Sequence, residues 1–198
     1  MRLRYFPETR RGKEKIPPTG GEHRYRLFSR NLEPMNGYDN SDHFTKSKTM
    51  HEEIPRERKT FLARDYSRGF IEYCQFKAEV IERGYFQSTV AIDEHHRQQD
   101  GFIHAGVMAT MADHTAGYSA FTTVSEDFQI LTIEFKINFL RPAFGEALVC
   151  RSKVLREGGQ IIISESEVFD IREGETELTA KAMVTLMAVH RDKLALKC

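Results

Sequence analysis

One stretch of the chain, from Ile103 to Phe121, is apolar or small along almost its whole length and contains a single carboxylate, Asp113. From Ala105 to Phe121 there is no proline, and alanine, glycine and methionine are frequent. This composition predicts a helix that has no solvated face, and such a helix must be surrounded by protein on most sides. Its small side chains would also let neighbouring backbone approach closely.

Asp113 is the leading candidate for a catalytic residue. Burial of an unpaired carboxylate in apolar surroundings costs free energy and shifts its pKa. A carboxylate in such a place can attack a carbonyl carbon, or it can activate water for that attack. The alternative is that Asp113 emerges at one exposed position and has no role.

The predicted start of the helix, at Ala105 and Gly106, offers a second functional feature. Backbone N–H groups there have no partner within the helix, and the helix dipole favours negative charge, so the site suits a developing oxyanion. Asp113 lies nine residues after His104, which corresponds to roughly 13 Å along a helix axis. One carbonyl group cannot touch both ends of that span. If both features act on one substrate, they must come from two copies of the chain in a symmetric dimer.

The segments around this helix predict an antiparallel sheet. A short helical segment from Arg58 to Glu72 leads in, and apolar residues alternate without a break from Leu131 to Phe139, which predicts a half-buried strand that ends at Pro142. Short, glycine-bearing connections predict antiparallel neighbours among the other strands, which are Tyr73–Ile81, Tyr85–Asp93, Ala147–Arg156, Gln160–Ile171 and Glu177–Val189. We therefore expect an α+β fold in which one antiparallel sheet wraps around one long central helix.

Residues 1–59 differ in composition from the rest of the chain. They contain five of the six prolines, no alanine, valine or cysteine, and 14 Lys and Arg against 9 Asp and Glu. So few aliphatic residues predict a disordered, basic N-terminal extension, with the domain at 60–192 and a C-terminal tail at 193–198. A nucleic-acid or membrane tail is an alternative, although the charges are mixed and no amphipathic face is present. Another alternative is that the native chain starts at Met50.

The overall composition argues for a protein without a nucleic-acid or membrane partner. The formal net charge is zero, so there is no global electrostatic attraction to either. Three cysteines at unrelated spacings, without a CxxC motif, indicate a reducing compartment. There is no long apolar run and no signal sequence. We expect a soluble, cytoplasmic protein with no membrane span.

Two runs of sequence, "DGFIHAGVMATMADHTAGYSA" and "LTIEFKINFLRPAFGE", resemble the PaaI-like acyl-CoA thioesterases of the hot-dog superfamily. That family has a His-Gly-Gly motif, an Asp nine residues past the His, and a later strand that ends in Pro-Ala before a Gly-Glu turn. The resemblance covers about residues 61–190. It implies a hot-dog fold, hydrolysis of acyl-CoA to a free acid and coenzyme A without a metal or other cofactor, and assembly as a homodimer or homotetramer.

The resemblance also implies roles for individual residues. Asp113 corresponds to the acid that acts as nucleophile or general base, and the sequence leaves both roles open. The N–H groups of Ala105 and Gly106 would stabilise the oxyanion. Family members usually have Gly at the position of Ala105, but the donor is a backbone group. His104 corresponds to the motif histidine, which would hold the helix start and polarise the thioester; a buried capping histidine is the alternative.

Two further side chains are matched less closely by the family pattern. Gln98 stands six residues before His104, where relatives commonly place an Asn that positions the attacking water or the thioester. Thr132 falls where a hydroxyl assists the water in some relatives, and an ordinary strand threonine is the alternative.

Coenzyme A phosphates could meet the basic residues that follow the central helix, although a solvated strand face would look the same; these residues are Lys136, Arg141, Arg151, Lys153 and Arg156.

Other chemistries fit the sequence less well. The histidines near Asp113 match no zinc-binding spacing, and no phosphate-binding glycine motif is present. One alternative function is a non-catalytic acyl-CoA-binding or regulatory module on the same fold, in which Asp113 would be dispensable. A hot-dog hydratase or dehydratase is a third reading, but the His/Asp or His/Glu pattern of those enzymes is missing.

Overall fold

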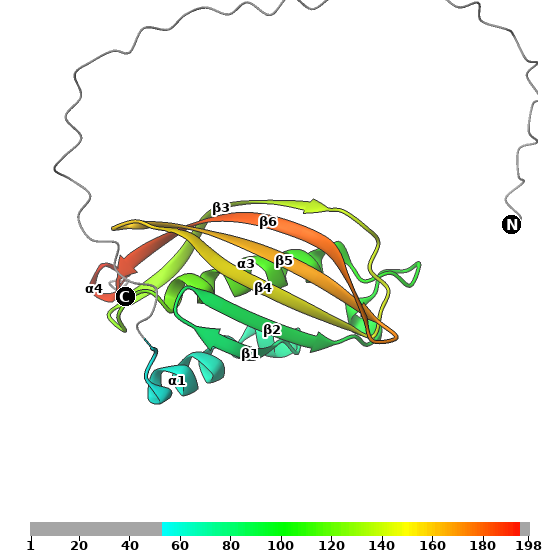
Figure 1. The fold of residues 1–198 in the computed structure, drawn as a ribbon, viewed down its shortest axis with the longest axis horizontal. Coiled ribbons are helices and arrows are strands. Elements are labelled where there is room, and N and C mark those ends of the chain that lie inside the picture. The colour runs from blue at the N-terminus through cyan, green and yellow to red at the C-terminus, as the bar shows by residue number, and fades with distance from the viewer. Residues whose placement is uncertain (1–52, 195–198) are drawn as a thin grey trace, which may run out of the picture. The chain divides into compact units, whose positions relative to one another are not determined.

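The structure, a computed structural model, describes residues 53–194. In this part of the chain one antiparallel sheet has the strand order β1-β2-β4-β5-β6-β3, and the long helix α3 lies against one side of it (Figure 1). The strands are β1 Lys77–Glu82, β2 Tyr85–Ala91, β3 Phe128–Phe139, β4 Ala147–Glu157, β5 Ile161–Arg172 and β6 Glu175–His190. The helices are α1 Arg56–Tyr66, α2 Phe70–Tyr73, α3 Ala105–Phe121 and α4 Arg191–Leu194, with a 3-10 turn η1 at Glu94–His96.

The predicted central helix is confirmed, and α3 has the bounds expected from the sequence. It packs on the sheet through small side chains, of which Ala112, Ala116 and Ala120 are fully buried. The Ser166 hydroxyl of β5 donates a hydrogen bond of 2.7 Å to the Ala112 carbonyl oxygen. A strand can approach a helix backbone this closely only because alanine presents no more than a methyl group.

One narrow strip of α3 is not covered by the described residues. It runs along the helix at a spacing of three to four residues, through Gly106, Ala109, Asp113 and Gly117, which are half-buried or exposed. The expectation of a helix enclosed on most sides is therefore correct, and Asp113 lies half-buried on the strip that remains. Its neighbours on the strip are small, so the strip leaves room for other molecules.

The predicted alternation in β3 is wrong at one residue. Thr132 pairs with Leu186 of β6, whereas Glu134 pairs with the adjacent Thr185, so Ile133 is an extra residue in a β-bulge. Leu186 is fully buried, so Thr132 faces α3. Phe135, after the bulge, pairs with Val184, which is also fully buried, so Phe135 faces α3 as well. Leu131, before the bulge, therefore faces the opposite side of the sheet from Phe135.

β3 is also more exposed than predicted. It forms an edge of the sheet (Figure 1), and most of its residues are exposed rather than half-buried. The apolar side chains of Ile133 and Phe139 are 54% and 46% exposed. An edge strand with unpaired backbone groups and exposed apolar side chains is a surface on which another strand can pair.

The remaining boundaries differ in detail from those predicted. The single lead-in helix is two helices, because the chain turns at Gly69 with φ +60°. β1 starts later than expected, since Gln75 adopts φ +60° and cannot belong to an extended strand. The tight turn with positive φ at Gly84 is confirmed, at φ +74°. The consecutive antiparallel pairing of β4, β5 and β6 is also confirmed.

The ends of the chain are described only in part. α1 begins at Arg56, so residues 56–59 are helical although they fall within the predicted extension of 1–59. The hypotheses about residues 1–52, including a start at Met50, lie outside the described residues, as does the tail from 195 to 198. Across residues 53–194 no helix combines the length and the hydropathy required to cross a membrane.

Candidate active site

The Asp113 carboxylate meets Thr132 across the interface between α3 and β3. The Thr132 hydroxyl donates a hydrogen bond of 2.9 Å to Asp113 Oδ1. This contact depends on the bulge at Ile133, because without the extra residue Thr132 would share the face of Glu134, which points away from the helix. The structure thus brings together two of the predicted site residues from separate elements.

Burial raises the pKa of Asp113 and lowers that of its neighbour His114, and both shifts favour the neutral form. Desolvation raises the pKa of Asp113 above its ordinary value, and the Thr132 hydroxyl partly opposes this shift by stabilising the carboxylate. Burial lowers the pKa of His114, which favours a neutral ring. His114 Nε2 lies 3.0 Å from the Tyr66 carbonyl oxygen, which can only accept, so Nε2 carries the proton.

A pocket of about 220 Å³ lies beside Asp113. Its walls come from α3, β3, the end of α1 and the start of α4, and they include the rings of Tyr118 and Phe121. The Tyr118 hydroxyl donates a hydrogen bond of 2.8 Å to Asp65 Oδ2 at the edge of this pocket. Burial raises the pKa of Tyr118 far above its usual range, so the hydroxyl remains a donor. Arg191 completes the lining.

Several of these pocket residues could not be identified directly from the sequence. Tyr118 and Phe121 lie on the same helix as Asp113 and could have been included from their positions alone. Asp65 and Arg191 are contributed by segments far away in the chain, and their place beside α3 follows only from the packing of α1 and α4.

At the other end of the strip, His104 caps the start of α3. Its ring Nδ1 accepts a hydrogen bond of 2.9 Å from the Gly106 N–H, while the residue itself is exposed. This hydrogen bond supports the predicted role in holding the helix start, which stays a prediction. Within the single chain the residue is exposed, whereas the capping alternative expected it to be buried. The Gly106 N–H is therefore already bonded, whereas the Ala105 N–H has no acceptor within residues 53–194.

The distance along the helix agrees with the estimate from the sequence. Ala105 and Asp113 are eight residues apart on one unbroken helix, which places the N–H donor and the carboxylate about 12 Å apart along the axis. Within a single chain, these two groups cannot contact the same carbonyl group.

Gln98 lies in the loop that leads into α3. The Gln98 N–H donates to the Phe102 carbonyl oxygen at 2.8 Å, and the Gln98 carbonyl oxygen accepts from the Gly101 N–H at 3.0 Å. This turn is closed by a bridge between Arg97 and Ile103. The half-buried Gln98 therefore lies near the donor end of α3 and apart from Thr132 in the same chain.

The five basic residues proposed to meet coenzyme A phosphates do not form one cluster within a single chain, contrary to expectation. Lys136 lies on β3, whereas Arg151, Lys153 and Arg156 lie on β4, and two strands separate β3 from β4 in the sheet. Lys153 forms an ion pair of 2.8 Å with Glu165, and Arg141 one of 2.7 Å with Glu177. Most of these side chains therefore face the outer side of the sheet as a mixed, partly paired surface.

The adjacent histidines before α3 have separate surroundings. His95 is 79% exposed in its side chain, whereas the ring of His96 is buried and accepts a hydrogen bond from the Asp93 N–H. They lie on a 3-10 turn rather than on the extended segment that the sequence suggested. Among residues 53–194 no group of three or more His, Cys, Asp or Glu side chains has the arrangement of a metal site.

In chemical terms, the pocket presents a carboxylate with a raised pKa that is still able to ionise, held by a hydroxyl donor. Such a group can accept a proton from water or attack an electrophilic carbon. The free N–H at the start of α3 can stabilise an oxyanion. These are the requirements of ester or thioester hydrolysis.

Comparisons with known proteins agree with this chemistry. A family described as "Thioesterase superfamily" matches residues 100–177. A protein of Saccharolobus solfataricus named "Putative esterase SSO2140" is 30% identical over 112 residues, which are 57% of this chain and 77% of that protein. The crystal structure of a thioesterase family protein from Silicibacter pomeroyi is 31% identical, with a TM-score of 0.64, over 66% of this chain and 98% of that one.

The fold is also that of the Escherichia coli PaaI protein from the phenylacetic acid degradation operon. That structure has a TM-score of 0.58 over 67% of this chain and 92% of PaaI, at 15% identity. The sheet wrapped around α3 is therefore a hot-dog fold, as the sequence predicted. By its sequence matches and its fold together, the chain belongs to the hot-dog thioesterase superfamily.

Proposed function

We propose that the protein hydrolyses acyl-CoA thioesters at composite sites, each built from two copies of the chain. The observation that carries this proposal is the position of Asp113. It is a half-buried carboxylate with a raised pKa, it faces a pocket, and it lies about 12 Å from the helix start that would stabilise an oxyanion. A second copy can supply that helix start, and the exposed edge strand β3 offers a surface for its association.

In the proposed reaction the thioester carbonyl lies between Asp113 of one subunit and the Ala105 N–H of the other. Asp113 either takes a proton from a water molecule that attacks the carbonyl carbon, or attacks that carbon itself to form an anhydride that water then hydrolyses. In both routes the oxyanion is stabilised by the N–H. Collapse of this oxyanion breaks the C–S bond, and the thiolate of coenzyme A takes up a proton. The acid is then released, directly in the first route and by hydrolysis of the anhydride in the second.

The structure suggests which predicted residues support this step. Thr132 would hold Asp113 through its hydroxyl, and His104 would keep the helix start in place through Gly106. The Gly106 N–H could act as a second donor only by releasing His104. Gln98 would position the attacking water from the donor side. The coenzyme A phosphates would meet some of the basic residues, of which only Arg141 and Lys153 form ion pairs within residues 53–194.

The direct test is a thiol-release assay on a panel of acyl-CoA substrates. We expect the wild-type protein to release coenzyme A, and Asp113→Asn to lower kcat by about 10²- to 10⁴-fold, the usual contribution of a general base. Asp127→Asn is the matched control, because Asp127 lies in the exposed turn before β3; it should retain wild-type activity.

Three outcomes would contradict the proposal in different ways. Binding of acyl-CoA without turnover would favour the non-catalytic module instead. Turnover that survives in Asp113→Asn would show that this carboxylate is not the reacting group. Hydrolysis of simple thioesters but not of acyl-CoA would remove coenzyme A from the proposal while keeping the hydrolase.

A further inference from the structure

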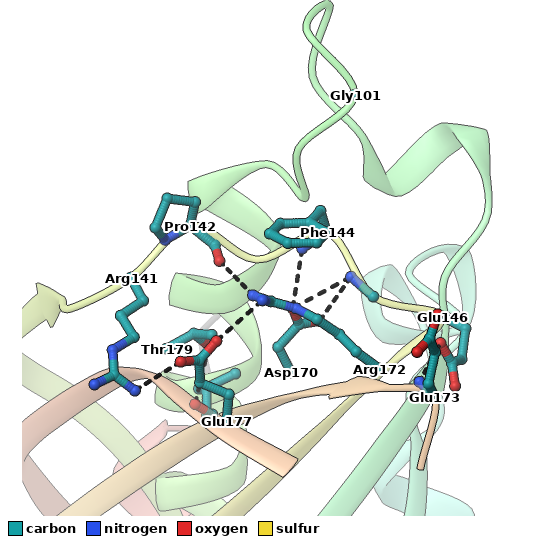
Figure 2. Close-up of polar contacts among 12 residues, drawn as sticks. Gly101, Arg141, Pro142, Phe144, Glu146, Asp170, Arg172, Glu173, Glu177 and Thr179 are labelled. Carbon is teal, nitrogen blue, oxygen red and sulfur yellow. Dashed lines mark hydrogen bonds and ion pairs between the residues drawn. The ribbon is translucent and has the colours of Figure 1, made fainter. Parts of the chain in front are cut away.

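A junction of polar contacts lies beside the start of α3, outside the Asp113 pocket (Figure 2). Its centre is Asp170 on β5, which is fully buried. The carboxylate accepts hydrogen bonds of 3.0 Å from the backbone N–H groups of Phe144 and Gly145, in the turn between β3 and β4. Buried and less buried residues alternate along β5, and Asp170 lies on the same buried side as Val168, where an apolar residue is expected.

Arg172 holds the same turn from the other side. Its Nε donates to Asp170 Oδ2 at 2.6 Å, and its Nη2 donates to the Pro142 carbonyl oxygen at 2.7 Å. The guanidinium stacks on the Phe144 ring at 3.6 Å, as Figure 2 shows. A side chain at Gly145 would collide with the Ile171 carbonyl and the Asp170 carboxylate, so the turn fits this closely only with glycine there.

Arg97 joins this turn to the loop that carries Gln98. Its Nη2 donates to the Gly145 carbonyl oxygen at 3.0 Å, and its Nη1 donates to the Gly101 carbonyl oxygen at 2.9 Å. The rings of Phe102 and Phe144 also meet edge to face, with centroids 6.2 Å apart. One guanidinium therefore fixes two loops relative to each other.

Both loops are bonded directly to the residues that precede α3. The Ile103 N–H donates to the Ala143 carbonyl oxygen at 2.7 Å, and the His104 N–H donates to the His96 carbonyl oxygen at 2.8 Å. These are the last two backbone N–H groups before that of Ala105. The position of the Ala105 N–H is thus determined by the junction, and not by the packing of α3 alone.

We propose that Arg97 and Asp170 are positioning residues that set the place of the Ala105 N–H in the oxyanion site. The inference rests on the proposed function, since it assigns them a part in that reaction. An oxyanion donor must be held to within about 0.5 Å of its productive place. A buried carboxylate and a guanidinium that together bond backbone groups of both loops provide that rigidity, far from Asp113 itself.

Arg97→Lys is the main test, because Arg97 is half-buried and lysine keeps the charge while losing the fork that spans two loops. We expect kcat for an acyl-CoA substrate to fall by about 10- to 100-fold, because a displacement of a positioned group by about 1 Å lowers the rate by up to about 100-fold. KM should change little, because an oxyanion contact is made only in the transition state. The acid side of the pH profile should not move, since Asp113 is untouched. Arg83→Lys is the control, as Arg83 pairs with Glu157 near the other end of α3.

Asp170→Asn provides a second variant. The amide would turn an NH2 group toward the N–H of Phe144 or Gly145 or toward Arg172, so one of these donors loses its acceptor. We expect the same loss in kcat with little change in KM. A change in KM alone, or a shift of the pH profile, in the Arg97 variant would overturn the inference.

Amide hydrogen exchange separates this inference from the proposed function. In Arg97→Lys the N–H groups of Ile103 and His104 should exchange at least about tenfold faster, while those in the middle of α3 keep their rates. Unchanged exchange at both residues would overturn the positioning role, whatever the activity. Faster exchange with unchanged kcat would also overturn it. Absence of thioesterase activity in the wild-type protein would instead refute the proposed function, and the exchange rates would still report whether the junction holds the helix start.

Discussion

Asp113 combines two properties that normally exclude each other, since it is partly withdrawn from water and yet must be able to ionise. Desolvation favours its neutral form, whereas the Thr132 hydroxyl, which can only be a donor to a carboxylate, favours the charged form. The result is a base that is stronger than a surface aspartate. Reactivity is thus obtained at a cost in folding free energy.

This cost leads to a prediction for the stability of Asp113→Asn. The pKa of Asp113 is higher in the folded than in the unfolded protein, so ionisation destabilises the folded state once the pH exceeds the ordinary aspartate value. The neutral and similarly shaped Asn avoids this penalty and can still accept from Thr132. We expect Asp113→Asn to have a higher Tm than wild type at pH 7.

The pH dependence provides the check on this explanation. The gain in Tm should shrink as the pH falls through the raised pKa of Asp113, and it should vanish near and below about pH 3.9, where the aspartate is protonated in both states. Thermal unfolding of both proteins across this range measures it. A gain that grows toward acid pH would mean that the ionised carboxylate stabilises the fold.

At the scale of elements, α3 is held to the sheet by a buried group of hydroxyls as well as by its alanines. The Thr115 hydroxyl is central to this group. It donates to the Met111 carbonyl oxygen at 2.6 Å, and it lies 2.8 Å from Ser88 Oγ on β2 and 3.1 Å from the Tyr66 hydroxyl on α1. All three side chains are fully buried. The hydroxyls let small side chains fill the interface without leaving polar groups unpaired.

We predict that Thr115→Val destabilises the protein although valine has nearly the same shape. The substitution removes the partner shared by Ser88 and Tyr66, and a buried polar group without a partner costs about 1–3 kcal/mol. Urea unfolding at fixed protein concentration measures the effect as a lower midpoint. Thr123→Val is the control, because Thr123 lies just past the end of α3, its hydroxyl bonds only the nearby Ala120 carbonyl, and it is half-buried. Equal effects in the two variants would rule out a special role for the buried group.

The sequence was most informative where one element carries the signal by itself. The bounds of α3 followed from an apolar run without proline, and the β4–β5–β6 meander followed from alternation and short turns. The bulge at Ile133 could not be predicted, because an extra residue is visible only against the register of β6. The same holds for Arg97 and Arg172, because each also bonds a backbone carbonyl of the distant turn between β3 and β4. Asp170 did leave a signal, as a charge at an inward-facing position of a strand.

At the scale of the whole molecule, one chain contains both halves of the proposed site but cannot bring them together. The uncovered strip on α3 joins the Ala105 end to Asp113 through small residues, and the exposed edge of β3 runs beside it. A two-fold axis near this strip would place the start of one α3 opposite Asp113 of the other, and would form two equivalent sites. The apolar side chains of β3 would then be covered.

The composite site predicts complementation between two inactive variants. Ala105→Pro removes the proposed N–H donor at the first position of α3, where proline fits a helix. The preceding residue, His104, already has the extended conformation that proline requires, with φ −64° and ψ 133°. Asp113→Asn removes the carboxylate. We expect each variant alone to be nearly inactive, while Ala105→Ser, which keeps the N–H, remains active.

When the two inactive variants are co-expressed with different tags and purified through both, every assembly isolated contains both chains. In a mixed dimer one site combines both defects, and the other combines the intact Ala105 N–H of one chain with the intact Asp113 of its partner. We therefore expect such dimers to recover about half of the wild-type kcat per dimer, because one of two equivalent sites is whole. If each site were built within one subunit, both sites of a mixed dimer would carry a defect, and no activity would return. Recovery thus depends on the two groups being contributed by different chains.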